Sequence, residues 1–304
     1  MSRCVRSLRA LSAAALIAVA ATVVLAVPAA AQEAAAATAP AAAPAEAPKY
    51  GWANTLVGAL NFTQTSFGNW AEGGTNSSAW QVSGSGTFKR VAKPTTWTNN
   101  LKLEYGEVRQ EDLETRKALD LIFLESVLDF NTSRYLKPYV AATAKTQFAR
   151  GYDYKTTPST AVSDFRDPLL LTQSAGIGYQ VKPWLMTRLG GALQETFTDE
   201  FRQYSDDAAT LDELEKTKVE GGLESVTTAD RWFGERLNVK SRLALFWAFN
   251  NSDQVDADWM TDVTLKAWGA LGVTLKLQML YNKDVLDAVQ VKQILGVGVS
   301  YAFI

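Results

Sequence analysis

The chain has 304 residues, a formal net charge of −2 at pH 7, one cysteine and no histidine. The absence of histidine excludes Ser-His and Cys-His nucleophile pairs, histidine-ligated zinc and histidine general bases. The slightly acidic balance gives no indication of a nucleic-acid partner. No residue pattern indicates a cofactor, a metal site or a catalytic constellation, so we expect a protein that is not an enzyme.

The first 31 residues have the features of a cleaved secretory signal peptide. Three arginines (Arg3, Arg6 and Arg9) precede the apolar run 10–27, and small residues follow up to Ala31. The alternative is an N-terminal membrane anchor, which the early Pro28 opposes. Cleavage after Ala31 removes Cys4, so the mature chain has no cysteine and a net charge of −5, from 27 basic and 32 acidic residues.

Residues 32–50 form an Ala/Pro-rich tract without side chains that pack. This composition predicts a disordered periplasmic leader. The alternative is a short helix that plugs the domain behind it, and the prolines at 40, 44 and 48 oppose that helix.

From residue 51 to residue 304, apolar and polar side chains alternate with a period of two, which predicts β-strands. Glu195 breaks the alternation, so a bulge or an early exit from the membrane is expected there. The expected strands cover 54–64, 77–90, 97–108, 118–131, 138–150, 169–181, 184–198, 217–228, 236–249, 257–268, 271–282 and 289–304.

About twelve such strands predict an all-β transmembrane fold, an antiparallel up-and-down β-barrel. An even number of strands closes a bacterial barrel, and short turns alternate with longer polar loops, as in outer-membrane proteins. No apolar run after the signal peptide is long enough for a transmembrane helix. The alternative is a soluble β-sandwich or a lipocalin-like calyx, which does not require charges confined to one face.

The last sixteen residues, Val289–Ile304, form the most amphipathic strand, with large apolar residues on one line and small or polar residues on the other. Its end, Tyr301-Ala302-Phe303-Ile304, resembles the terminal signal of bacterial outer-membrane barrels. That resemblance implies recognition by the barrel-assembly machinery and a location in the outer membrane of a Gram-negative bacterium. We expect this strand to close the barrel against residues 54–64, in a monomer surrounded by lipid.

Three motifs resemble an uncharacterised bacterial family, domain of unknown function 3078. The motifs are Asn69–Asn76 (NWAEGGTN), Arg116–Asp120 (RKALD) and Phe148–Tyr154 (FARGYDY) followed by Asp164–Pro168 (DFRDP). The resemblance extends from about Trp52 to the C-terminus. It implies an outer-membrane β-barrel of Bacteroidetes-type bacteria and no activity, because the family has none assigned.

The first motif places Asn69, Trp70, Gly73 and Gly74 in an external loop. The two glycines allow positive φ in a tight turn, and Trp70 is expected to pack over the barrel mouth. A structural role for this loop and a contact with a ligand are both open.

The polar face, turned inward, predicts a lumen with nearly balanced charges. One hypothesis is a narrow channel for small polar solutes; the alternative is a structural or interaction barrel with a filled lumen. The solute or protein partner is not identifiable. The expected lumen residues are Lys102, Glu104, Glu125, Asp129, Lys145, Arg188, Glu220, Glu224, Lys240, Arg242, Asp262 and Lys266, with Lys276 and Lys292 beside them.

Two acidic groups allow other chemistry. The loop 199–216 carries seven acids, which suit either Ca²⁺ or a solvated loop with a short external helix at residues 211–216. Glu220 and Glu224 suit either the carboxylate pair of a glycosidase or ordinary charges on the lumen wall.

Overall fold

Twelve antiparallel strands close into one barrel in the computed structural model, which describes residues 50–66, 75–111, 113–206, 213–250, 255–283 and 285–304. Consecutive barrel strands pair with each other, and the last one pairs back onto the first. The strands are β1 (Gly51–Thr65), β2 (Ser77–Val91), β3 (Thr95–Gln110), β4 (Arg116–Phe130), β5 (Leu136–Thr146), β8 (Leu169–Lys182), β9 (Leu185–Phe197), β10 (Thr217–Phe233), β11 (Leu237–Ala248), β12 (Asp256–Trp268), β13 (Leu271–Asn282) and β14 (Leu286–Ala302).

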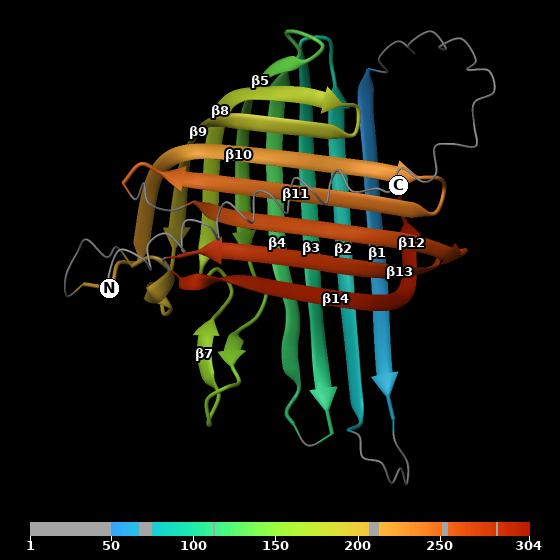
Figure 1. Cartoon of the computed structure of the whole chain (residues 1–304), viewed down its shortest axis with the longest axis vertical. Coiled ribbons are helices and arrows are strands. Elements are labelled where there is room, and N and C mark those ends of the chain that lie inside the picture. The colour runs from blue at the N-terminus through green and yellow to red at the C-terminus, as the bar shows by residue number, and fades with distance from the viewer. Residues whose placement is uncertain (1–49, 67–74, 112, 207–212, 251–254, 284) are drawn as a thin grey trace, which may run out of the picture. The chain divides into compact units, whose positions relative to one another are not determined.

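The all-β class, the number of strands and the closure by the C-terminal strand are thereby confirmed. Residues 57–61 of β1 lie opposite residues 302–298 of β14. In Figure 1 the near wall, β10 to β14, runs across the strands β1 to β4 of the far wall. The alternatives of a β-sandwich and a lipocalin-like calyx are therefore wrong for this chain.

The two ends of the barrel differ in their connections. The short-turn end comprises residues 92–94, 131–135, 183–184, 234–236 and 269–270, and the long-loop end comprises the other connections. Two of the tight turns depend on glycine, since Gly234 and Gly269 have φ angles of 64° and 55°.

Side chains alternate between the outer face and the lumen, as the period of two predicts. On β1, Leu60 is 52% exposed on the outer face, whereas the next residue, Asn61, is 5% exposed and lies inside. Lumen side chains are mostly polar, because charged and amide groups need the partners that facing walls supply. Among the described residues, no helix is long and apolar enough to cross a membrane.

Several boundaries differ from the expectation. The fifth strand ends at Thr146 rather than 150, and the loop after it contains a hairpin, β6 (Gly151–Asp153) with β7 (Thr160–Ser163). β10 continues to Phe233, five residues beyond the expected end at residue 228.

The bulge expected at Glu195 is absent. β9 keeps a continuous register with β8 and β10 at that position. Glu195 lies on the outer face, where its carboxylate accepts a hydrogen bond of 3.0 Å from the Gln173 amide. It is two residues from the strand end at Phe197.

Candidate functional site

The predicted lumen residues come from strands all around the barrel and lie on their inward faces. They are not equally enclosed: Glu104 and Glu125 are buried, whereas Lys240 and Lys266 are exposed near the short-turn end. Lys266 places its ammonium 4.5 Å from the centre of the Trp232 ring. Lys240 pairs with Asp230 at 3.3 Å.

Ion pairs cross the lumen near the middle of the strands. Lys102 of β3 donates a 2.7 Å hydrogen bond to Asp262 of β12, and Lys276 of β13 pairs with Glu104 of β3. Nearer the long-loop end, Lys145 at the end of β5 pairs with Asp258 at the start of β12. Since the joined strands are not neighbours in the barrel, the side chains bridge opposite parts of the wall.

Glu125 is the centre of a second cluster. Its carboxylate accepts from Arg188 at 2.7 Å and from Arg242 at 3.3 Å. The Asn100 amide donates to its other oxygen at 3.0 Å. Glu125 is 4% exposed, so these donors replace the water that the carboxylate loses on burial.

Apolar side chains fill the space between the clusters. Leu121 and Phe123 of β4 pack with Met260 of β12 inside the lumen. The Arg242 guanidinium lies 5.1 Å from the centre of the Phe123 ring. Leu121 and Phe123 are on the same inward face of β4 as Glu125. They therefore place apolar side chains among the polar ones of this face, and the direction of the strand's faces stays as predicted.

Besides Lys240 and Lys266, three more predicted residues form no hydrogen bond or ion pair with either cluster over the described ranges. Glu220 pairs with Lys218 at 3.1 Å, and Glu224 lies further along β10; both glutamates are buried. Asp129 is also buried and lines a cavity towards the short-turn end. Asp258 is missing from the sequence-based set, although its position four residues before Asp262 on the same strand face is a usable signal.

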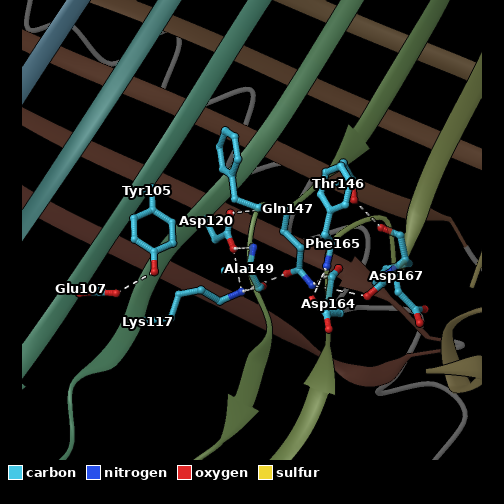
Figure 2. Close-up of polar contacts among 12 residues, drawn as sticks. Tyr105, Glu107, Lys117, Asp120, Thr146, Gln147, Ala149, Asp164, Phe165 and Asp167 are labelled. Atoms are coloured by element: carbon cyan, nitrogen blue, oxygen red, sulfur yellow. Dashed lines mark hydrogen bonds and ion pairs between the residues drawn. The ribbon is translucent and has the colours of Figure 1, made fainter. Parts of the chain in front are cut away.

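A polar network at the long-loop end joins two of the sequence motifs (Figure 2). The Asp120 carboxylate accepts from the backbone N–H groups of Phe148 and Ala149, at 2.7 and 3.0 Å. It also pairs with Lys117 at 2.8 Å, and Lys117 donates to the Ala149 carbonyl at 2.6 Å. The start of β4 therefore holds the segment that leads into the β6–β7 hairpin.

The last motif continues this network. Arg150 donates to Asp164 and to Glu200, both at 2.7 Å, and so joins the hairpin segment to the loop after β9. The hydrogen bond from Arg150 lowers the pKa of the Asp164 carboxyl. Asp167 accepts from the backbone N–H groups of Glu200 and Phe201, at 2.6 and 3.2 Å.

Some predicted features lie outside the described residues. Asn69, Trp70, Gly73 and Gly74 fall in residues 67–74, and part of the acidic loop falls in residues 207–212. In the described part of that loop, Asp199 pairs with Lys216, and a short 3₁₀ helix covers Arg202–Tyr204. Within the residues that the structure describes, no three acidic or cysteine side chains form a group suited to a metal ion.

Comparisons with known proteins agree with the family resemblance over part of the chain. A family model described as protein of unknown function (DUF3078) matches residues 62–152, which include the first two motifs and the beginning of the third. No curated protein matches the sequence.

Two solved barrels are similar in fold. The translocator domain of the autotransporter NalP from Neisseria meningitidis has 11% identity and a TM-score of 0.37, over 84% of this chain and 90% of that one. OmpF from Salmonella typhi, in complex with daunomycin, has 10% identity and a TM-score of 0.26, over 83% of this chain and 97% of that one. Neither similarity bears on the activity of this chain.

Proposed function

We propose that this chain is an integral outer-membrane protein of a Gram-negative bacterium, a barrel whose lumen is closed by charged side chains. It then acts as a structural or binding barrel and not as an open pore. The predicted signal peptide supports export, and the exposed Tyr301 of β14 and Phe303 just after the strand suit recognition by the barrel-assembly machinery.

The outer face supports insertion into lipid. It exposes large apolar side chains on many strands, for example Leu189 (60%), Ile177 (56%) and Leu295 (64%). In water such a surface is an aggregation hazard. In a bilayer it is the lipid-facing band of a barrel.

Aromatic side chains on the outer face mark both edges of this band. Each set includes a close ring pair, Trp52–Trp97 with centroids 6.3 Å apart and Trp80–Tyr105 with centroids 5.8 Å apart. Outer-membrane barrels carry such aromatic girdles at both lipid–water interfaces. The set at the short-turn end is Trp52, Trp97, Tyr179 and Tyr301, and the set at the long-loop end is Phe62, Trp80, Tyr105 and Trp247.

The separation of the girdles fits a membrane. Trp52 and Phe62 lie ten residues apart on β1, which is about 33 Å along a strand at ~3.3 Å per residue. A strand tilt of roughly 45° reduces this to about 23 Å across the membrane, close to the ~25 Å apolar band of such barrels.

The observation that carries the closed lumen is the Lys102–Asp262 pair across the barrel, with Lys276–Glu104 beside it. A solute that passes must separate charges that are partly desolvated, and each separation leaves an uncompensated charge in the wall. The alternative is a narrow channel for small polar solutes, which requires these pairs to rearrange.

Membrane insertion is testable with a spin label on the outer face. Because the mature chain lacks cysteine, Leu189→Cys gives one labelling site in reconstituted protein, and Lys155→Cys in the exposed hairpin turn gives a matched control. We expect molecular oxygen to relax the label at residue 189 more than a water-soluble nickel complex does, and the reverse at residue 155. Preferential relaxation by nickel at residue 189 contradicts the insertion.

A further inference from the structure

The lumen contains a cavity of about 440 Å³ in its half nearest the short turns. Pro183 and Trp184 line it at the turn between β8 and β9, and Phe123 and Met260 line it near mid-height. The volume suits a small organic molecule. The side chains of Val127 and Met186 add further apolar surface to the wall.

Most charges in the cavity wall already have partners. Glu125 pairs with Arg188 and Arg242, Lys102 with Asp262, and Lys240 with Asp230. Two lining residues, Asp129 and Lys89, have no ion-pair partner in the described part of the chain. The cavity wall therefore has one carboxylate and one ammonium that form no direct ion pair, although Arg188, Lys137 and Lys89 lie near enough to Asp129 to attract its charge.

Asp129 is the more unusual of the two. It is 7% exposed, and its Oδ1 atom has no hydrogen-bond donor among the described residues. A buried carboxylate oxygen without a donor is unfavourable, so such groups are normally satisfied by the protein, by water or by a ligand. Oδ1 is itself enclosed, so a protonated amine in the cavity meets the carboxylate at its other oxygen, where it supplies a donor and the opposite charge.

Lys89 lies on the same side of the cavity, on β2. Lys89 is paired with Thr98 on β3, and Thr98 is paired with Val127 on β4. Asp129 is two positions after Val127 on β4. The backbones of Lys89 and Asp129 are therefore separated by two strand spacings and two residues along a strand, which is about 12 Å. Both side chains point inward, and the long Lys89 side chain reaches towards Asp129, so their charged ends are able to hold the two ends of one small molecule.

We propose that this cavity binds a small zwitterion, with its protonated amine on the Asp129 carboxylate and its own carboxylate towards Lys89. This assignment goes beyond a closed barrel, since a closed lumen needs no ligand. It rests on the proposed function in one respect: the ion pairs near mid-height that close the lumen also form one end of the cavity.

Isothermal titration calorimetry on the purified full-length barrel in detergent tests the proposal with three matched probes. They are 4-aminobutyrate, butylamine, which lacks the carboxylate, and butyrate, which lacks the amine. We expect saturable heat from 4-aminobutyrate, and weaker binding of the other two. Equal binding of butylamine and 4-aminobutyrate overturns the zwitterion assignment, and absence of heat from all three overturns the site.

Variants connect the binding to the two residues. Asp129→Asn has almost the same shape and is expected to weaken 4-aminobutyrate binding roughly tenfold or more, through loss of a charge-assisted hydrogen bond. Lys89→Gln is expected to weaken 4-aminobutyrate but not butylamine, and it keeps the test valid if Asp129→Asn does not fold. The control Asp153→Asn, in the hairpin at the opposite end, is expected to bind like the unmodified protein. Unchanged binding in Asp129→Asn or Lys89→Gln overturns the proposal, whatever the conductance of the barrel is.

Discussion

Lys102 and Asp262 are 160 positions apart in the sequence, yet the Lys102 Nζ atom lies 2.7 Å from an Asp262 carboxylate oxygen inside the barrel. The two residues belong to β3 and β12, which face each other across the lumen. Lys276 and Glu104 form a second pair next to them, so four residues join three strands. This arrangement favours the filled lumen over the narrow channel.

Glu125→Gln is expected to destabilise the barrel by about 3–5 kcal/mol, because it leaves the buried Arg188 and Arg242 without their carboxylate. Urea unfolding in detergent micelles measures the change. The same substitution at the exposed Glu114, in the loop before β4, is the control and is expected to be neutral. Equal midpoints for the two variants contradict a structural role for the Glu125 cluster.

Gly190 and Gly191 are adjacent on β9 and form a matched pair. A Cβ atom on Gly190 lies 2.3 Å from the Ala175 carbonyl oxygen, whereas one on Gly191 meets nothing within 4 Å. Gly190→Ala is therefore expected to cost about 1–3 kcal/mol, and Gly191→Ala is expected to leave stability unchanged or slightly raised. Thermal unfolding followed on unboiled gels compares the two, and a larger loss for Gly191→Ala is the contrary result.

Asp120→Ala is expected to release the segment that leads into the β6–β7 hairpin, since it removes the acceptor for the Phe148 and Ala149 amides. Trypsin cleavage after the exposed Lys155 reports the release, and we expect faster cleavage while the barrel itself stays protected. Glu114→Ala removes an exposed acid at the same end of the barrel and serves as the control. A cleavage rate equal to that of the unmodified protein contradicts this role of Asp120.

The Arg150–Asp164 pair makes the hairpin sensitive to acid. Because the pKa of Asp164 is lowered in the folded state, the pair stabilises the loop above the ordinary carboxyl pKa of about 3.9. This contribution is lost as the pH falls from that value through the lowered pKa that Asp164 has in the folded state. A spin label at Lys155→Cys is expected to become more mobile between pH 6 and pH 3.

The matched variant for this pH test is Arg150→Gln, which removes the partner of both Asp164 and Glu200. The label is expected to be mobile in it at both pH values. If the mobility of the label changes by the same amount between the two pH values in the variant, the acid sensitivity belongs to other groups and the prediction is contradicted.

Strand positions and faces were predictable because alternation is a local property. Leu60 outside and Asn61 inside follow from the sequence of β1 alone, and the inward direction of Lys102 follows from the sequence of β3. The partner of Lys102 was not predictable, since it depends on the stagger and tilt of strands that are far apart in the sequence. Likewise, the short hairpin β6–β7 has too few alternating residues to be distinguished from a loop.

The motif residues show the same division. The sequence identifies Arg116–Asp120 and Phe148–Tyr154 as motifs, but only the fold shows that Asp120 accepts from the backbone of Phe148 and Ala149. Leu121 and Phe123 were ambiguous because apolar residues fit either face of a barrel whose lumen contains an apolar cluster.

Single-channel recording in planar bilayers tests the closed lumen most directly. The unmodified barrel is expected to show no steady conductance, whereas the double variant Lys102→Ala/Asp262→Ala, which removes both members of the bridge, is expected to show small conductance steps. Steady open-pore steps from the unmodified protein, unchanged in the double variant, contradict the proposal that these side chains close the barrel.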